Sequence, residues 1–349
     1  MGVAGRRMRA VWVLVGLAAL TVGLVAVDRI VASRAPALSA TPRPGWQLIR
    51  PPGEVHALAL QGEIVWAGGK DGLVGLDRRN GAIVRQVRCE PPLTYVWALL
   101  VDRAGTLWIG HEGGLTSYDG EACRTYTDRD GLPDDRVTSL LEDRQGRLWA
   151  GTWRGAAVRE ATGWRTLTAA DGLLDDMVNV MYEDDQGGLW FGSYVAPRGG
   201  LSCLQDGRWQ HFTSSEGLPH NNINAILQDR NGALWVGTGL VDRGGACELV
   251  RGADGWEIRR VLGEQDGLAG AKVRSLFQDR SGLYWFGSEY SGFATGDGSR
   301  WQRFSVQDGL ADPEVKAILQ DPSGDIWLGT RNGITRISAA AQEALRPGS

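Results

Sequence analysis

A pattern of short apolar stretches separated by polar turns repeats along most of the chain. Its clearest marker is a Trp-x-Gly triplet, which occurs seven times at spacings of 41 to 50 residues. The tryptophans that begin these triplets are Trp66, Trp108, Trp149, Trp190, Trp235, Trp285 and Trp327. Six of the units carry an Asp six residues before the Trp and a Gly three before it, and the first unit lacks the Asp. A fixed period of this length is typical of repeat folds such as solenoids and propellers.

Each unit predicts four short strands. The first strand is apolar, as in VTSLL from residue 137, and leads into an Asp-x-x-Gly turn, in which the Asp can bond the backbone and the Gly can adopt a positive φ. The second strand holds the Trp-x-Gly triplet, the third begins at a Gly pair or Gly-Leu, and the fourth has a Trp-x-x-Phe-like pattern, as at 209–212. Four strands in about 41 residues match a propeller blade, and the Trp packs one blade on the next. We therefore predict an all-β fold, a seven-bladed β-propeller with four-stranded blades over residues 46–338.

The two ends of the repeat predict how the ring closes. The last unit stops at its third strand, Gly333–Ile337, and a polar tail, 339–349, follows it. The segment 46–50 precedes the first unit and has the fourth-strand pattern. We expect this segment to pair into the seventh blade, which removes the open sheet edges. The alternative, an open solenoid, would leave both ends unpaired.

The N-terminal region predicts export to the far side of a membrane. A basic segment, 1–9, precedes 18 uncharged residues, 10–27, which as a helix would span roughly 27 Å and cross a bilayer. The arginines before this run favour a cytoplasmic N-terminus, and 28–45, rich in Ala, Pro and Ser, would form a linker. We therefore expect one N-terminal transmembrane helix in the bacterial inner membrane, with the propeller in the periplasm or outside the cell. The alternative is a signal peptide cleaved between 35 and 40, which would release a secreted propeller.

Several units resemble a known family of repeats. The segments EGLPHNNINAILQDRNGALWVGTG (216–239) and RDGLPDDRVTSLLEDRQGRLWAGT (129–152) are similar to the two-component regulator propeller repeat. The resemblance covers nearly all of 46–337. This family forms the extracytoplasmic sensor part of many bacterial hybrid histidine kinases. The resemblance therefore implies ligand sensing, often of polysaccharide fragments, with the signal passed to a kinase, although this chain has one ring where the family commonly has two.

Two tryptophans fall outside the repeat. Of the 15, seven begin the triplets, five lie in fourth strands and Trp12 lies in the apolar run. Trp97 stands at the second position of a first strand, and Trp153 lies in the next blade's loop between strands two and three, so both should approach the same face. An exposed aromatic pair offers flat apolar area with a polar edge, which suits a sugar ring or a partner's side chain. The alternative is that both are buried between blades.

The second position of each first strand varies where its surroundings do not. These side chains would ring the mouth of the central channel, and they are His56, Trp97, Thr138, Asn179, Asn224, Arg274 and Lys316. The loops between strands two and three add further polar groups, and the loops at 193–200 and 238–245 are longer than their counterparts, which often marks the binding side. The candidate ligand-binding residues are Trp97, Trp153, Arg154, His111, Glu112, Tyr194, Arg198, Arg243, Glu289, Tyr290, Arg331, Asn179, Asn224, Arg274 and Lys316. A solvated rim without a ligand is the alternative.

Composition and charge narrow the classes of function. A net charge of −4 argues against nucleic-acid binding, and 43% hydrophobic residues argue against a disordered chain. The four His show no metal-ligand spacing, and one Asp per turn gives too few ligands for calcium, so we expect no metal and no cofactor. Carboxylate pairs such as Glu112 and Glu289 could support acid–base chemistry, but no motif fixes their separation.

The four cysteines leave the redox state open. Cys89, Cys123, Cys203 and Cys247 could pair in an oxidising compartment in three full connectivities. Cys203 and Cys247 fall on opposite strand faces. We expect mostly buried, free thiols.

These observations predict a non-catalytic periplasmic ligand-binding or sensor propeller that recognises a glycan or oligosaccharide on its loop face. The first alternative is a protein-interaction scaffold, or a sensor subunit for a separately encoded histidine kinase. The second is a polysaccharide-acting enzyme such as a lyase, which the shortage of His disfavours. Expected partners are a saccharide or other small ligand, a membrane kinase or other periplasmic protein, and the membrane itself through 10–27, with no nucleic acid.

Overall fold

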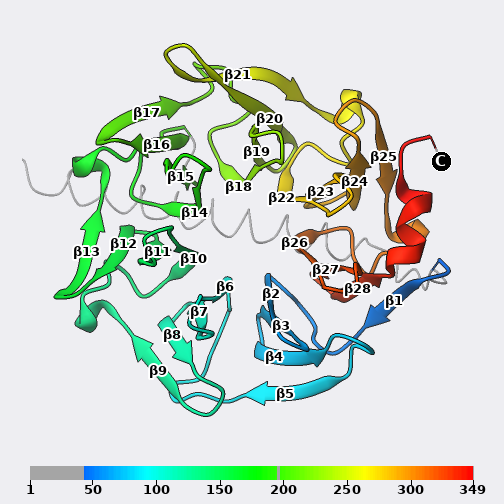
Figure 1. Cartoon of the computed structure of the whole chain (residues 1–349), viewed down its shortest axis with the longest axis horizontal. Helices are drawn as coiled ribbons and strands as arrows, with labels where there is room; N and C mark the ends of the chain where they lie inside the picture. The colour runs from blue at the N-terminus through cyan, green and yellow to red at the C-terminus, as the bar shows by residue number, and fades with distance from the viewer. Residues whose placement is uncertain (1–42, 195–196, 349) are drawn as a thin grey trace, which may run out of the picture. The chain divides into compact units, whose positions relative to one another are not determined.

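The computed structural model describes residues 43–194 and 197–348. This part of the chain forms 28 β-strands and five short 3-10 helices, and the strands make seven four-stranded antiparallel sheets arranged around a central channel (Figure 1). The predicted all-β, seven-bladed propeller is confirmed. The predicted membrane span at 10–27 lies outside the described residues, and no helix within those residues is long and apolar enough to cross a bilayer.

Six blades are continuous in sequence, and their strands run outward from the centre in chain order. Blade one consists of β2 (Ala57–Gln61), β3 (Ile64–Gly69), β4 (Gly72–Asp77) and β5 (Ile83–Val87). Blade two consists of β6 (Ala98–Val101), β7 (Leu107–His111), β8 (Gly114–Tyr118) and β9 (Cys123–Tyr126). Blade three consists of β10 (Val137–Glu142), β11 (Leu148–Thr152), β12 (Gly155–Glu160) and β13 (Gly163–Leu167). Blade four consists of β14 (Val178–Glu183), β15 (Leu189–Ser193), β16 (Leu201–Gln205) and β17 (Arg208–Phe212). Blade five consists of β18 (Ile223–Gln228), β19 (Leu234–Leu240), β20 (Arg243–Gly252) and β21 (Gly255–Leu262). Blade six consists of β22 (Val273–Gln278), β23 (Tyr284–Ser288), β24 (Phe293–Gly296) and β25 (Trp301–Phe304).

The seventh blade joins the two ends of the ring. It consists of β26 (Val315–Gln320), β27 (Ile326–Thr330), β28 (Gly333–Ile337) and, as its outer strand, β1 (Trp46–Ile49). β1 runs antiparallel to β28, with Trp46 opposite Ile337, and the two lie side by side in Figure 1. The predicted closure by an N-terminal strand is therefore observed.

The C-terminal segment differs from the predicted polar tail. Ala339–Leu345 forms a 3-10 helix, η5, and Leu345 is fully buried against the core between blades six and seven. Thr295 Oγ1 also donates a hydrogen bond to the Leu345 carbonyl. The prediction was wrong here because one buried Leu at the end of a short polar segment leaves no periodic signal.

Short 3-10 helices explain the Asp-Gly-Leu motif between blades. Four connections contain such a turn: η1 (Asp128–Asp130), η2 (Ala169–Asp171), η3 (Glu264–Asp266) and η4 (Val306–Asp308). Each ends at a Gly with φ between 101° and 119°, a conformation that other residues adopt only with strain. The motif thus marks the point at which the chain turns from an outer strand to the next inner strand.

A hydrogen bond between aspartate and tryptophan repeats in six blades. The Asp of each Asp-x-x-Gly turn accepts a bond from the indole Nε1 of the Trp six residues later, at 2.8–3.1 Å, and a second bond from a backbone N–H four residues on. The pairs are Asp102–Trp108, Asp143–Trp149, Asp184–Trp190, Asp229–Trp235, Asp279–Trp285 and Asp321–Trp327. In blade one, Gln61 Oε1 accepts from Trp66 Nε1 at 2.9 Å instead. The turn aspartates therefore also fix the orientation of the packing tryptophans.

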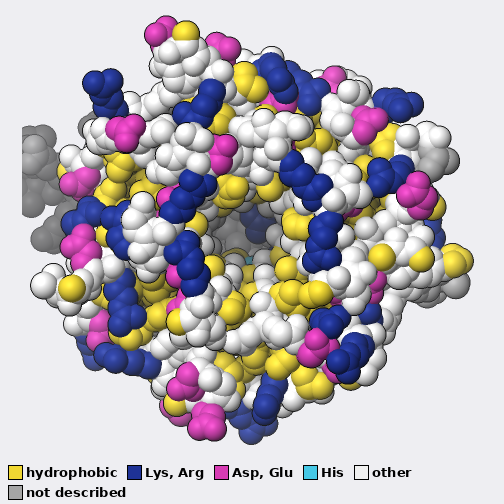
Figure 2. Space-filling view, in the orientation of Figure 1, with side chains coloured by type: hydrophobic (Ala, Val, Ile, Leu, Met, Phe, Trp, Pro, Cys, Tyr) yellow, Lys and Arg dark blue, Asp and Glu magenta, His cyan; other side chains and the backbone are white. Residues whose placement is uncertain are grey.

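A second repeated bond joins five of these six turns to the next blade; in the sixth, Pro322 follows the Asp and has no N–H to donate. The backbone N–H of the residue after the Asp donates to a side chain at the end of the next inner strand, at 2.7–3.0 Å. The pairs are Arg103–Glu142, Arg144–Glu183, Asp185–Gln228, Arg230–Gln278 and Arg280–Gln320. The face with the Asp-x-x-Gly turns is thus tied together from blade to blade. The ring leaves an opening at its centre, which is hollowed and bordered by basic and apolar side chains (Figure 2).

A disulfide corrects the prediction for two of the four cysteines. Cys89 follows β5 in blade one, Cys123 begins β9 in blade two, and the two are bonded with their Cα atoms 5.6 Å apart. Cys203 and Cys247 are free and buried, as predicted. The pairing depends on two outer strands meeting across a blade boundary, which the spacing of the cysteines alone does not determine.

Replacing Asp184 by Ala should destabilise the ring. Its buried carboxylate accepts from Trp190 Nε1 and Gly188 N, both at 2.9 Å, and both donors would be left unpaired in the interior. We expect the free energy of unfolding to fall by about 2–4 kcal/mol. Urea denaturation monitored by tryptophan fluorescence measures this change. Asp254→Ala, in an exposed turn between β20 and β21, is the control and should change stability by less than about 0.5 kcal/mol. Equal stabilities of the two variants would contradict the assignment.

Candidate ligand-binding site

The mouth of the central channel is built from a β-bulge in five inner strands. In β10, for example, Val137 pairs with Thr152 and Ser139 with Gly151, so Thr138 is left out of the ladder. A bulge of this kind redirects the side chain of the extra residue. The residues placed in this way are Thr138, Asn179, Asn224, Arg274 and Lys316. His56 and Trp97 occupy the equivalent place immediately before β2 and β6.

All seven of these side chains line one pocket of about 280 Å³, together with Arg136, Trp153 and Tyr194. We call it the mouth pocket. Trp97 and Trp153 therefore meet at one site from neighbouring blades. Trp153 is 42% exposed, so the alternative that both tryptophans are buried between blades does not hold for it.

Aromatic side chains gather where blades one, two and three meet the mouth pocket. The Trp97 ring lies edge-on to His56, with centroids 4.4 Å apart, and is stacked with Tyr95 at 5.8 Å. The Trp97 indole Nε1 donates to Glu112 at 3.2 Å, and the other carboxylate oxygen of Glu112 accepts from Arg136 Nε at 2.7 Å.

Arg136 links this aromatic side to the second tryptophan. Its guanidinium carbon lies 3.7 Å from the centroid of the Trp153 ring, a cation–π contact. Glu112 thus holds both Trp97 and the cation that supports Trp153. One connected group of side chains fixes the two aromatic faces before any ligand arrives.

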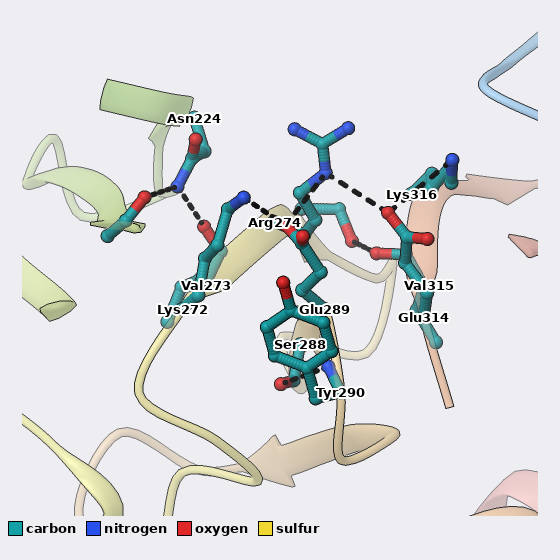
Figure 3. Close-up of polar contacts among 12 residues, drawn as sticks. Asn224, Lys272, Val273, Arg274, Ser288, Glu289, Tyr290, Glu314, Val315 and Lys316 are labelled. Carbon is teal, nitrogen blue, oxygen red and sulfur yellow. Dashed lines mark hydrogen bonds and ion pairs between the residues drawn. The ribbon is translucent and has the colours of Figure 1, made fainter. Parts of the chain in front are cut away.

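Charged side chains gather on the other side of the mouth pocket, in blades six, seven and one (Figure 3). Lys272 pairs with Glu289, and Lys316 pairs with Glu54. Arg274 Nε lies between two carboxylates, 3.8 Å from Glu289 and 3.6 Å from Glu314. Three cations and three carboxylates therefore share this side.

The pKa values on the charged side follow from burial and these partners. Burial raises the pKa of Glu54, but the bonds and charges of His56 and Lys316 outweigh it and lower that pKa to about 2. Glu289 behaves in the same way, because Arg274 and Lys272 lower its pKa against the effect of burial. Burial dominates at Glu314 and raises its pKa. Glu314 is therefore the carboxylate of this cluster that takes up a proton most easily.

Thr138, Asn179 and Asn224, the hydroxyl and amide residues among these seven, bond to the main chain of the next blade. Thr138 Oγ1 donates to the Val178 carbonyl at 2.7 Å, and Asn179 Nδ2 donates to the Ile223 carbonyl at 2.8 Å. Asn224 Nδ2 donates likewise to the Val273 carbonyl at 3.1 Å. These side chains tie blades together at the mouth, and their oxygens remain as acceptors. Asn224 Oδ1 is buried and accepts no hydrogen bond within the described chain.

The structure distributes the remaining candidates differently. Tyr194 lies in the mouth pocket, where its hydroxyl accepts from Lys272 Nζ at 3.1 Å. Glu112 and Arg154 line an adjoining depression with Arg136 and Trp153. Four candidates do not line the mouth pocket: Arg198, Tyr290 and Arg331 lie in loops, and Arg243 begins β20.

His111 corrects the prediction that it belongs to the ligand-binding surface. It is fully buried at the end of β7. Its Nδ1 accepts from the Gly113 backbone N–H, so Nε2 carries the proton and donates to Thr116 Oγ1 at 2.9 Å. Burial lowers its pKa to about 4. Both hydrogen bonds of the imidazole lie within the hairpin formed by β7 and β8. The side chain therefore stabilises that hairpin and does not face the mouth pocket.

Sequence reasoning missed the residue that precedes the Val or Ile at the start of each inner strand. This position carries Glu54, Tyr95, Arg136, Met177, Asn222, Lys272 and Glu314. Five of these seven, all except Met177 and Asn222, contact either one of the seven inner-strand residues that line the mouth pocket or a side chain that is bonded to one of them. The signal was present in the repeat, because this position also varies between units.

The mouth pocket presents aromatic faces, amide groups and cations to a ligand. It has few side chains that could ligate a metal. Within residues 43–194 and 197–348, no group of three or more His, Cys, Asp and Glu is placed to hold a metal ion. Glu112 and Glu289 lie in different blades, and each is paired with a cation. These contacts suit the binding of a polar ligand with an apolar face.

The class defined by this architecture is a seven-bladed β-propeller with a pocket at the mouth of its channel. Five segments, 91–113, 131–154, 172–195, 217–239 and 309–332, match the family model described as Two component regulator propeller. The chain thus carries repeats of the two-component regulator propeller family. No curated protein matches the sequence.

Solved structures share the fold at low sequence identity. The extracellular domain of a putative hybrid two component system from B. thetaiotaomicron superposes with a TM-score of 0.73 at 20% identity, over 86% of this chain and 42% of that one. PorZ, a surface component of the type-IX secretion system of Porphyromonas gingivalis, gives 0.65 at 15% identity, over 83% of this chain and 47% of that one. Virginiamycin B lyase from Staphylococcus aureus gives 0.65 at 14% identity, over 84% and 98%. The chain spans less than half the length of the first two, and the likeness concerns the fold alone.

The buried His111 should make stability depend on pH. Its pKa is about 4 in the folded chain and about 6.5 when unfolded, so the unfolded state binds an extra proton between these values. His111 therefore lowers the free energy of unfolding by up to about 3 kcal/mol as the pH falls from 6.5 toward 4, and it has no such effect above pH 6.5. In His111→Gln, the decrease in unfolding free energy between pH 7.5 and 4.5 should be about 2–3 kcal/mol smaller than in the wild type. Denaturant titrations at both pH values measure this difference. Equal pH sensitivity of the two proteins would contradict the inward, uncharged state of His111.

Proposed function

We propose that this chain is a non-catalytic sensor propeller that binds a saccharide in the mouth pocket. One observation carries the proposal: Trp97 and Trp153 line the same pocket as the amide side chains of Asn179 and Asn224 and the cations of the inner strands. A sugar ring has an apolar face and a hydroxyl-bearing edge. The tryptophans suit the face, and the asparagine, lysine and arginine side chains that line the pocket suit the hydroxyls.

The size and rigidity of the mouth pocket support a small ligand. Its volume of about 280 Å³ lies near the lower end of the range for ligand pockets and suits one or two sugar rings. The contacts of Glu112 and Arg136 hold both tryptophans in place, so less conformational entropy is lost when a ligand binds.

The proposed location is the periplasm or cell exterior, with residues 10–27 as the membrane anchor. The basic residues before that segment support this orientation, and the shared fold with an extracellular sensor domain is consistent with it. Binding would then be reported to a membrane kinase or another periplasmic protein. Secretion after cleavage of the N-terminal segment is the alternative.

A non-catalytic role is proposed because two of the carboxylates at the mouth already hold cations. Lys316 pairs with Glu54 and Lys272 with Glu289, and these cations help to lower the pKa of both carboxylates, which leaves the two poorly suited to take up a proton. Glu314, whose pKa burial raises, is the exception and is the carboxylate on which an enzyme would rely. The shared fold with a lyase makes an enzyme the alternative, and a product assay on the same saccharides would reveal turnover.

A protein-interaction scaffold is the second candidate, and one observation favours it. Leu240 and Val241 are exposed at the tip of the hairpin between β19 and β20, on the same face as the mouth pocket. Two adjacent exposed apolar side chains at a hairpin tip offer a contact for an apolar side chain of a partner protein. If the chain is such a scaffold, a Leu240→Asp and Val241→Asp double variant should lose binding to the periplasmic domain of a separately encoded histidine kinase and keep any saccharide binding. Unchanged binding to that domain would count against the scaffold.

Loss of the aromatic faces should abolish saccharide binding. Trp153→Ala and Trp97→Ala remove the stacking surface, so we expect the affinity for the best-binding oligosaccharide of a neutral and acidic panel to fall at least about 10-fold. Isothermal titration calorimetry on the full chain in detergent measures this loss. Val261→Ala, an exposed residue on the outer strand β21, is the control and should bind as the wild type does. If no oligosaccharide binds, or if both Trp variants bind like the wild type, the proposal is wrong.

A further inference from the structure

Arg274 is a cation in the mouth pocket to which residues 43–194 and 197–348 offer no hydrogen-bond acceptor. Its side chain is 22% exposed, and its Nε is buried with no hydrogen-bond partner in the described chain. The two carboxylates nearest to it, on Glu289 and Glu314, lie 3.8 and 3.6 Å from that nitrogen, beyond hydrogen-bond distance. Figure 3 shows the two terminal nitrogens directed away from both carboxylates, with no contact drawn to them.

Arg274 shares both of its counter-ions with lysines, because Glu289 also pairs with Lys272 and Glu314 with Lys316, and neither carboxylate comes within hydrogen-bond distance of the guanidinium Nε. Glu289 pairs with Lys272, and Glu54 pairs with Lys316. Glu314 lies 3.4 Å from Lys316 and is the carboxylate whose pKa burial raises. A partly buried guanidinium with unused N–H donors costs free energy until an acceptor arrives. The unused edge of Arg274 therefore favours an acceptor that the chain itself does not supply.

The geometry points to a ligand that carries a carboxylate, so we infer that the saccharide of the proposed function is a uronic acid or a short oligomer containing one. This inference rests on that proposed function. A guanidinium offers two parallel N–H donors that match the two oxygens of a carboxylate. Because Glu289 and Glu314 already offset part of the charge on Arg274, a group with one negative charge suits it better than a phosphate with nearly two.

The remaining groups of the mouth pocket set the orientation of such a ligand. Trp97 and Trp153 lie in blades two and three, and Arg274 lies in blade six, so the two features approach the mouth pocket from different sides of the channel. Asn224 also lines this pocket, and its Nδ2 is already bonded to the Val273 carbonyl. A uronic acid would therefore place its carboxylate at Arg274 and its ring toward the tryptophans.

The test compares acidic oligosaccharides with their carboxyl-reduced forms, which differ only at the acid group. The probes are oligomers of galacturonate, of alginate and of hyaluronan, titrated into the full chain by calorimetry. We expect at least one acidic probe to bind and its reduced form to bind about 10- to 100-fold more weakly. The Arg274→Gln variant should bind the acidic probe only as tightly as the wild type binds the reduced probe. Arg85→Gln, on the outer strand β5, is the matched control and should leave binding unchanged.

Arg274→Lys keeps the positive charge, and therefore the balance with Glu289 and Glu314, but lacks the planar pair of donors. We expect it to fold like the wild type and to bind the acidic probe less than about 10-fold more tightly than the reduced probe. It decides the outcome if Arg274→Gln does not fold, as judged by circular dichroism.

The outcomes separate this inference from the proposed function. If acidic and reduced probes bind the wild type equally and Trp153→Ala still weakens both, the saccharide site stands and the carboxylate inference is wrong. The inference is also overturned if Arg274→Lys discriminates as well as the wild type, or if only sulfated sugars without a carboxylate bind. If no saccharide binds, the proposed function and the inference both fail.

Discussion

The hydrogen bond from a tryptophan indole to the turn aspartate six residues earlier is the interaction on which the propeller depends. The carboxylate accepts from the main chain of its own turn and from the ring that packs against the next blade, so one buried group fixes both the hairpin and the blade interface. Such bonds are strengthened in the low-dielectric interior. Repetition in six blades gives the ring a uniform geometry, and the fourth strand contributed by Trp46–Ile49 closes it.

Blade one departs from this rule and is held in other ways. Gln61, an uncharged acceptor, replaces the aspartate there. The same blade is joined to blade two by the Cys89–Cys123 disulfide, which closes a separation of 34 residues. A covalent link across such a loop stabilises the folded chain by about 4 kcal/mol in the chain-entropy account. The most degenerate unit of the repeat is thus the one with a covalent connection to its neighbour.

The sequence predicted the fold well because the repeat is local. Each unit carries its own turn, strand and tryptophan signals within about 41 residues, and the missing fourth strand of the last unit indicated the closure. It also placed Trp97 and Trp153 on one face. It missed the contacts that depend on which blades meet, such as Lys316 with Glu54, which lie 262 residues apart. The inward turn of His111 and the pairing of Cys89 with Cys123 escaped for the same reason, since neither follows from spacing along the chain.

The bulges of the inner strands place the pocket-lining residues outside the strand pairing that holds each blade together. Because the bulged residue takes no part in the strand ladder, its side chain can change while the pairing of its blade is preserved. Unlike Thr138 and the two asparagines, Arg274 and Lys316 bond to no backbone carbonyl among the residues that the structure describes, and are therefore the positions most free to vary. The propeller is a scaffold on which a few substitutions at the bulges could exchange one ligand for another without rebuilding the core.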